Sequence, residues 1–375
     1  MKPNQFLILI LLIFSCTKKQ EKATIVGDWE FDKSINLNKI NKDKTPPSLF
    51  NNFHEEFEFL ENNECLYKNG FFDIVENKNK QERYVVFKGH KLNYNYNSPT
   101  LTLKYLNDSI FSIYKIKKIT NDSLIFIDEK YKYLSFYRRI KDNTNKIEFD
   151  KIIVTSSGCF GPCRISSTTV DKSGNVNLNN YMYTEKNGSY ISKITKNHFL
   201  DIQKQFNKVN IDLLNNDYAL NATDGNSISV TFIKNNKIYK TITDYMGQSP
   251  TGFRQAYTDL VYLSQSLQLS RKKYKPQFDF FTIISIGNKR GRMRLSDSEG
   301  VYLQSELENS VITTANFKPN FELTFLDFKQ NDEKINYIYT DGRYFKFIFL
   351  NKKEITYDLG YNFIEKNELK FELNK

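Results

Sequence analysis

The stretch from Ile110 to Ile127, IFSIYKIKKITNDSLIFI, indicates the fold class of this chain. From Ile110 to Ile119 apolar and polar residues roughly alternate, as expected of a strand with one buried face. Asn121 and Asp122 then form a turn, and the apolar run Leu124 to Ile127 follows directly. Short strands joined by tight turns are typical of an antiparallel barrel or sandwich, so we expect a mainly β protein.

The composition of the 375-residue chain agrees with this expectation. Aromatic residues make up 15% of the chain, and Phe (31) and Tyr (24) far outnumber the single Trp. Aromatic and β-branched residues favour strands, and the length suggests two or three domains. The formal net charge is +11. Because the basic residues are spread along the chain, this charge is typical of compositional bias rather than of a surface for anionic lipid, glycan or nucleic acid.

The N-terminus has the pattern of an export signal. Lys2 precedes nine apolar residues, Phe6 to Phe14, and Ser15-Cys16 follows. Nine residues are too few to span a bilayer, which takes about 20, but they suit the apolar region of a secretory signal. A small residue followed by Cys resembles a bacterial lipoprotein signal, and this resemblance implies that Cys16 carries lipid, including palmitate. The alternative is an ordinary cleaved signal with a chance Cys.

A lipidated Cys16 would hold the protein in the bacterial cell envelope, because more than one acyl chain anchors a protein stably. The early pair Lys18-Lys19 differs from the acidic stretch expected in surface-exposed lipoproteins. It therefore favours the periplasmic face, with the choice of inner or outer membrane left open. The expected partners are the membrane, a small apolar ligand or another envelope protein, and export argues against nucleic acid.

Two polar joints, near residues 140–150 and 270–277, divide the rest of the chain. We expect a signal peptide (1–15), a polar tether (16–24), a β domain (25–140), an α+β domain (148–270) and a β-rich C-terminal domain (278–375).

The first domain begins with IVGDWEF, residues 25–31, and ends with LSFYRR, residues 134–139. These motifs resemble the small lipocalin-like domains of bacterial lipoproteins. The resemblance implies that Gly27 and Trp29 open a barrel and that one of the two closing arginines covers the Trp. Such a barrel can hold a small apolar ligand if its mouth is open. Any β-sandwich with a single core Trp remains the alternative.

The middle domain shows strands and helices in the order β-β-β-β-α-β-β-α. Thr195 is expected to cap the first helix, and Ser249-Pro250 to cap and open the second. The second helix carries an apolar stripe from Phe253 through Leu267. This order predicts an antiparallel sheet with two helices on one face. The third domain is expected to be β-rich, with Asp341-Gly342 as a hairpin turn.

A cysteine pair lies between the first two strands of the middle domain, in SGCFGPCR, residues 157–164. A strand, Cys-Phe-Gly-x-Cys and a second strand resemble the bacterial family known as domain of unknown function 6438. That family has no assigned activity, and analogy of fold alone supplies none. It usually continues Cys-Pro-x-Tyr, whereas Arg164-Ile165-Ser166 stands here, so no role of that Pro or Tyr is carried over.

Cys159 and Cys163 are close enough in sequence to form a disulfide if the chain curls, and an exported protein meets an oxidising compartment. Two buried thiols in a tight turn would serve a similar structural role. There are two functional alternatives. One is thiol exchange, and the other is a copper site formed with His198, since thiolates and imidazole suit that metal. Cys65 lies alone in the first domain and is expected to be a buried thiol.

Other chemistry is sparse in the sequence. The three His residues show no metal spacing, and no catalytic motif or phosphate loop occurs. The basic cluster Gly287 to Arg294 fits a solvated hairpin tip better than a phosphate or lipid contact. We expect a non-catalytic binding or scaffolding protein without a cofactor. The alternative is a thiol-redox or copper-handling protein that uses Cys159 and Cys163.

Overall fold

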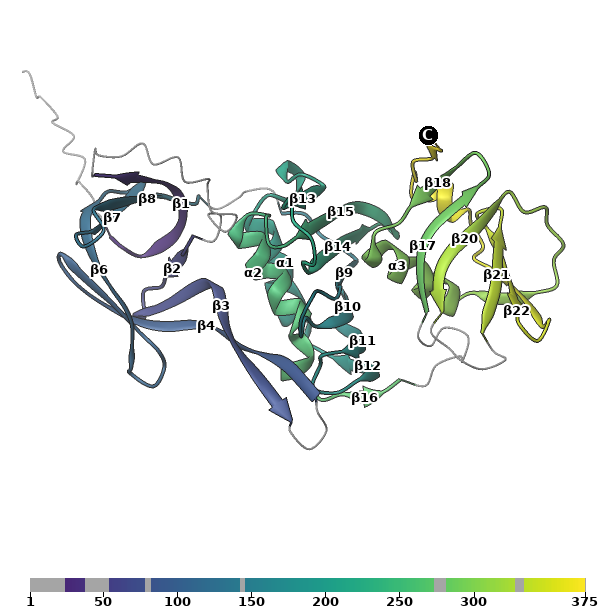
Figure 1. Cartoon of the computed structure of the whole chain (residues 1–375), viewed down its shortest axis with the longest axis horizontal. Coiled ribbons are helices and arrows are strands. Elements are labelled where there is room, and N and C mark those ends of the chain that lie inside the picture. The colour runs from purple at the N-terminus through teal and green to yellow at the C-terminus, as the bar shows by residue number, and fades with distance from the viewer. Residues whose placement is uncertain are drawn as a thin grey trace, which may run out of the picture.

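The computed structural model describes residues 24–37, 54–77, 82–141, 146–272, 281–327 and 334–374. The expected signal peptide and Cys16 lie outside these residues. Three bodies follow one another along the longest axis: a barrel, a central sheet with two helices, and a C-terminal sheet (Figure 1). The fold is mainly β, as the sequence predicts.

The N-terminal strands close into an antiparallel barrel, because β1 pairs with both β2 and β8. The opening stretch of the sequence forms β6 and β7, with Lys115 opposite Ile127. The barrel strands are β1 (Gly27–Asn36), β2 (Phe57–Phe59), β3 (Glu64–Asn77), β4 (Glu82–Asn97), β5 (Thr100–Lys104), β6 (Ile110–Ile119), β7 (Ser123–Asp128) and β8 (Tyr133–Arg139). The first domain is therefore a barrel and not a sandwich.

The barrel core forms around Trp29, which is fully buried and whose Nε1 donates to Ile25 O at 2.7 Å. Arg139 is the arginine that covers it, with its guanidinium 4.3 Å from the ring centroid. Arg138 points elsewhere and pairs with Glu30 at 2.8 Å. The predicted Gly-x-Trp strand and its closing arginine are therefore in contact.

The central sheet has the strand order β13-β15-β14-β9-β10-β11-β12-β16. Its strands are β9 (Lys151–Ser156), β10 (Ile165–Asp171), β11 (Asn175–Met182), β12 (Gly188–Lys193), β13 (Asp217–Ala219), β14 (Ser227–Lys234), β15 (Lys237–Tyr245) and β16 (Ser270–Arg271). All described pairs are antiparallel except β13 with β15. The sheet is therefore antiparallel as predicted apart from this edge, where a three-residue strand is too short to leave a periodic signal.

Two helices, α1 (Lys196–Lys208) and α2 (Thr251–Val261), cover one face of this sheet (Figure 1). Thr195 caps α1 as predicted, accepting from the His198 backbone N at 3.1 Å. The predicted cap of α2 is one residue early, since Pro250 is the N-cap. The Ser249 hydroxyl instead donates to Asp244. The apolar stripe extends beyond the end of α2 into the short helix η2 (Leu263–Ser266). Another short helix, η1 (Ile211–Leu213), follows α1.

The C-terminal sheet has the order β19-β23-β22-β21-β20-β17-β18-β24. Its elements are β17 (Phe281–Asn288), β18 (Gly291–Arg294), α3 (Asp297–Glu308), β19 (Val311–Thr313), β20 (Phe321–Asp327), β21 (Ile335–Thr340), β22 (Tyr344–Phe349), β23 (Glu354–Asp358), α4 (Phe363–Lys366) and β24 (Glu372–Leu373). The Asp341-Gly342 turn joins β21 and β22 as predicted, and the basic cluster lies on the β17–β18 hairpin.

The third domain is β-rich as predicted, and helix α3 is an element that the sequence analysis did not single out. Ser296 and Glu299 form a capping box at its start, a signal present in the sequence. The helix packs on β17 and on the second face of the central sheet, where Ser298 bonds Ser229 and Thr231 at 2.6 and 2.7 Å. The central sheet is therefore covered on both faces, by α1 and α2 on one side and α3 on the other.

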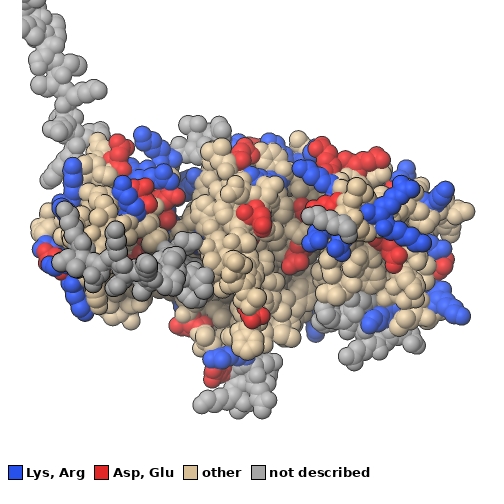
Figure 2. Space-filling model, turned by 45° about the horizontal axis from the view of Figure 1, so that its top comes forward, with Lys and Arg blue, Asp and Glu red and all other residues tan. Residues whose placement is uncertain are grey.

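Charged side chains of both signs are interspersed on the face displayed in Figure 2. This distribution agrees with basic residues that are spread along the chain rather than gathered in one segment.

Candidate functional site

The cysteine turn between β9 and β10 is closed by a disulfide. Cys159 and Cys163 are bonded, with their Cα atoms 5.5 Å apart. Gly161 has φ +152°, a backbone conformation that favours glycine. Its N donates to Cys159 O at 2.8 Å. Phe160 at the tip is 92% exposed, although its backbone N is held by Asp224 O at 3.0 Å. The motif therefore forms a short closed loop that presents one aromatic ring.

The start of β14 holds this loop in place. The Asn226 side chain donates to Ser156 Oγ at 3.1 Å and to Ser157 O. Ser157 N donates to Ser227 O at 2.9 Å, and Ser157 Oγ accepts from Ser227 N at 2.9 Å. Because side chains as well as backbone fix both ends, the residues that follow the loop have defined positions.

The first of these residues is Arg164, which is only 3% exposed. Its Nε donates to Ser166 Oγ at 3.1 Å. Its Nη2 donates to Asn180 Oδ1 at 3.0 Å and to Ser264 Oγ at 2.6 Å. All three acceptors are neutral oxygens. Burial lowers the pKa of Arg164, and the partial offset comes from Tyr262 and Glu185.

Arg164 borders a cavity of about 300 Å³. A second cavity, of about 560 Å³, adjoins it. The two share Phe72, Asn226, Ile228, Tyr257 and Thr258, so we treat them as one cleft. Cys163 also borders the smaller cavity, which places the disulfide at one end of the cleft.

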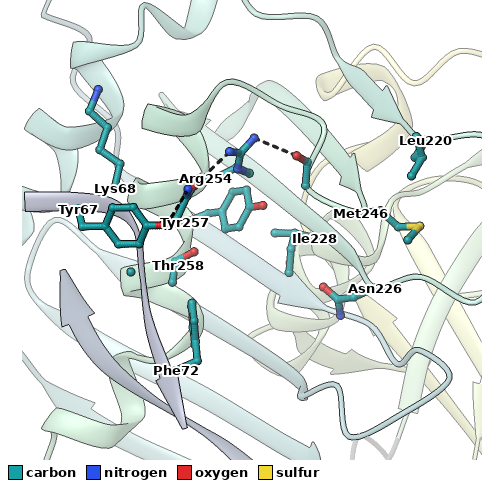
Figure 3. A pocket seen from close by; sticks show the side chains of 13 residues that line it. Tyr67, Lys68, Phe72, Leu220, Asn226, Ile228, Met246, Arg254, Tyr257 and Thr258 are labelled. Atoms are coloured by element: carbon teal, nitrogen blue, oxygen red, sulfur yellow. Dashed lines mark hydrogen bonds between the residues drawn. The ribbon is translucent and has the colours of Figure 1, made fainter. Parts of the chain in front are cut away.

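The cleft lies between the barrel and the central domain (Figure 3). Tyr67 and Phe72 come from β3, Thr258 comes from α2, and Asn226 and Met246 lie on the far side, as Figure 3 shows. Phe72 continues into an aromatic cluster on the barrel side of the cleft. Its ring centroid lies 5.2 Å from that of Phe87 and 5.6 Å from that of Tyr262.

Polar contacts dock the barrel on the two helices of the central domain. Lys208 of α1 pairs with Glu58 at 2.8 Å. Thr251 of α2 donates to Glu56 at 3.0 Å, and Phe87 N donates to Gln265 Oε1 at 3.1 Å. These contacts hold the barrel against the central domain and so fix the two walls of the cleft relative to each other.

Lys68 is a buried cation behind the barrel wall of the cleft. Its Nζ lies 2.5 Å from Asp28 and 3.4 Å from Glu56. Burial alone would lower the pKa of Lys68, but the two carboxylates outweigh it and the pKa is raised. Burial raises the pKa of Glu56. The positive charge of Lys68 is thus balanced by two carboxylates. Arg164, in contrast, has only neutral hydrogen-bond acceptors.

Arg254 lies in the wall of the larger cavity. Its Nη1 donates to Gly247 O at 2.9 Å and Ser249 O at 2.7 Å. Its Nη2 donates to Thr251 Oγ1 at 2.9 Å and reaches Asn69 Oδ1 of the barrel at 3.3 Å. Arg254 therefore ties the start of α2 to β3.

The weak copper hypothesis is not supported by the geometry. Both thiols are consumed in the disulfide. His198 borders a separate cavity of about 470 Å³ with Asp201 and Asp259. In the part of the chain that the structure describes, no cluster of three or more His, Cys, Asp or Glu residues could hold a metal ion.

Cys65 is a free, buried thiol, as predicted, and burial raises its pKa.

Within the described residues, no helix is long and apolar enough to cross a membrane. The site residues that the sequence did not single out include Phe72, Asn226 and Arg254. Arg164 was noted only as a departure from the family pattern, and an arginine beside a buried strand is the signal that could have found it.

Comparison with known proteins places the cleft partly within a recognised domain. Residues 150–264 match the family described as Domain of unknown function (DUF6438). The match includes the disulfide loop, Arg164 and α2. No curated protein and no solved structure matches the chain. The resemblance inferred from Cys-Phe-Gly-x-Cys is confirmed for these residues, and it carries no assigned activity.

Proposed function

We propose that this chain is a lipid-anchored bacterial envelope protein that binds a small ligand in the cleft between the barrel and the central domain. The observation that carries the proposal is the continuity of the two cavities, about 560 and 300 Å³, which share five lining residues contributed by both domains. Ligand sites favour such interfaces and volumes. The anchor rests on the Ser15-Cys16 pattern of the N-terminus.

The cleft suits a ligand better than the barrel does. Trp29, Phe57 and Phe59 pack with other apolar side chains into the core of the barrel itself. A hollow of about 670 Å³ on β5 to β8 is lined by charged residues that include Glu55, Lys115 and Glu129. Such walls do not favour the small apolar ligand expected from a lipocalin-like domain. That the barrel is a lipocalin-like domain is part of this proposal.

The role is proposed to be binding rather than catalysis. Two charged side chains that border the cleft are engaged structurally: Lys68 is held by two carboxylates, and Arg254 by carbonyl, hydroxyl and amide oxygens. Neither is arranged as a nucleophile with an adjacent base.

A ligand that copurifies with the protein tests this proposal. Protein isolated from its own membrane is analysed by native mass spectrometry, as wild type and as Thr258→Trp, which fills the part of the cleft common to both cavities. Lys204→Trp on the exposed face of α1 is the matched control. We expect a bound mass in wild type and control that Thr258→Trp loses. A bound mass that is unaffected by Thr258→Trp, or no bound mass in any of the three, would count against the cleft.

Thiol exchange is the second candidate, favoured by the position of Cys163 beside Arg164 on the cavity wall. A nearby guanidinium lowers the pKa of a thiol and promotes exchange. Equilibration with glutathione buffers measures the potential of the pair. A value well above roughly −300 mV would favour exchange, and a lower one a structural disulfide.

A further inference from the structure

Arg164 has donors that nothing in the described structure uses. A guanidinium carries five N–H donors, and three hydrogen bonds leave from Nε and Nη2. Nη1 is buried and has no hydrogen-bond partner. Within the described ranges Arg164 also forms no ion pair with a carboxylate, unlike Lys68, and the more distant Glu185 offsets its burial only in part. A buried charge is normally paired, because removal from water is costly.

Arg164 also borders the smaller cavity of the cleft, where a ligand could provide a partner for its charge. Its remaining lining residues are Phe72, Val85, Ser156, Pro162, Cys163, Asn226, Ile228, Tyr257, Thr258, Val261 and Tyr262. All of these side chains are neutral, so the guanidinium is the only charge in the wall. One positive charge is balanced by a monoanion. A phosphate monoester, at about −1.5 to −2 near pH 7, would leave excess negative charge in the cavity.

The other residues that line the cavity indicate what kind of ligand would fit. Phe72, Val85, Ile228 and Val261 contribute apolar surface, and Tyr262 adds a ring whose centroid is 5.4 Å from the Arg164 guanidinium. The volume of about 300 Å³ is at the small end for ligand sites. It fits a compact aromatic or short aliphatic group.

We propose that Arg164 binds the carboxylate of a small monocarboxylic acid whose apolar body lies against Phe72 and Ile228. This inference deepens the proposed function and rests on the cleft as its site. Nη1 donates to the carboxylate, while Ser166, Asn180 and Ser264 hold the guanidinium in place. The closed loop of Cys159 and Cys163 fixes the backbone from which Arg164 extends.

Matched acids and amides test the charge requirement without altering the protein. Binding of phenylacetate and octanoate is measured by ligand-observed NMR on the full-length wild type, beside phenylacetamide and octanamide. We expect the acids to bind at least about tenfold more tightly than the amides of equal shape. Phenyl phosphate is included as the dianion, and we expect it to bind more weakly than phenylacetate.

Two variants locate the effect. Arg164→Gln should abolish the preference for the acid, and Arg164→Lys should retain part of it. Thr258→Trp should block all of the probes. Because a change at buried Arg164 can impair folding, the comparison of acid with amide on wild type stands independently.

Three results would overturn the inference: acids and amides that bind equally, a preference for phenyl phosphate, or acid binding that Thr258→Trp leaves intact. Equal binding that Thr258→Trp blocks would refute the carboxylate while supporting the cleft. Absence of binding by every probe would also refute the carboxylate, and the copurification experiment decides the cleft separately.

Discussion

The guanidinium of Arg139 lies over the indole of Trp29, 4.3 Å from the ring centroid. Arg139 also donates to Thr24 O at 2.9 Å and to Val26 O, so it ties the first strand to the last. A cation over a Trp face stabilises by about 0.5–2 kcal/mol depending on burial. The contact joins residues that are far apart in sequence, and Gly27 leaves the space for it.

We predict that Gly27→Ala destabilises the barrel by about 1–3 kcal/mol. Gly27 has φ +142°, and an added Cβ would lie 1.9 Å from Arg139 Nη1, which its hydrogen bonds hold in place. Urea unfolding followed by the fluorescence of Trp29, the single Trp, measures the loss. Gly89→Ala is the matched control, because Gly89 has φ +92° with open space around it. Equal losses at both positions would mean that the contact with Arg139 contributes nothing.

Removal of the disulfide should lower the free energy of unfolding by about 2 kcal/mol, from the loop-closure entropy of so short a loop. Cys159→Ser and the double variant Cys159→Ser, Cys163→Ser should lose the same amount, since either breaks the bond. Denaturant unfolding of the middle domain, followed by circular dichroism, makes the comparison. A single variant as stable as wild type would show that the pair is not bonded in solution.

Lys68→Met should destabilise the protein by about 3–5 kcal/mol, because it leaves Asp28 and buried Glu56 without their shared cation. Lys172→Met, which removes an exposed partner of Asp150, is the control and should change little. Urea midpoints at neutral pH test both. If Lys68→Met were as mild as Lys172→Met, the buried cluster would not hold the barrel wall together.

Stability should fall as the pH drops below 6.5. Burial, assisted by Arg254, lowers the pKa of His54 from 6.5, so the unfolded chain binds the proton more readily than the folded one. The contribution is present above pH 6.5 and is lost as the pH falls through the lowered pKa. His54→Phe keeps the stack on Phe31 and should reduce this loss. Unfolding at pH 7.5 and 5.5 compares it with the control His198→Asn. An unchanged pH dependence in His54→Phe would contradict the assignment.

Cys16→Ser should release the protein from membranes into the soluble fraction and abolish its labelling with palmitate. Fractionation of cells that express each form, with metabolic labelling, is the measurement. Retention of the variant in membranes would contradict anchoring through Cys16 and would favour another means of attachment.

The sequence by itself determined the local structure. Alternation between Ile110 and Ile119 specified a strand, because one face of that segment is apolar. Asp341-Gly342 specified the hairpin turn between β21 and β22. Thr195 marked a helix start because its hydroxyl accepts from the first turn. Helix α3 was missed although Ser296 and Glu299 carried its capping box.

Only the tertiary structure decided how these elements meet. Closure of the barrel depends on pairing β1 with β8, about a hundred residues away, which local periodicity does not encode. The cleft exists because the barrel docks on α1 and α2 through contacts such as Glu58 with Lys208. The role proposed for Arg164 likewise depends on the tertiary structure. In sequence it is one basic residue among many. In the fold it is buried among neutral partners, its Nη1 has no hydrogen-bond partner, and the residue borders a cavity, because charge compensation is set by neighbours in space.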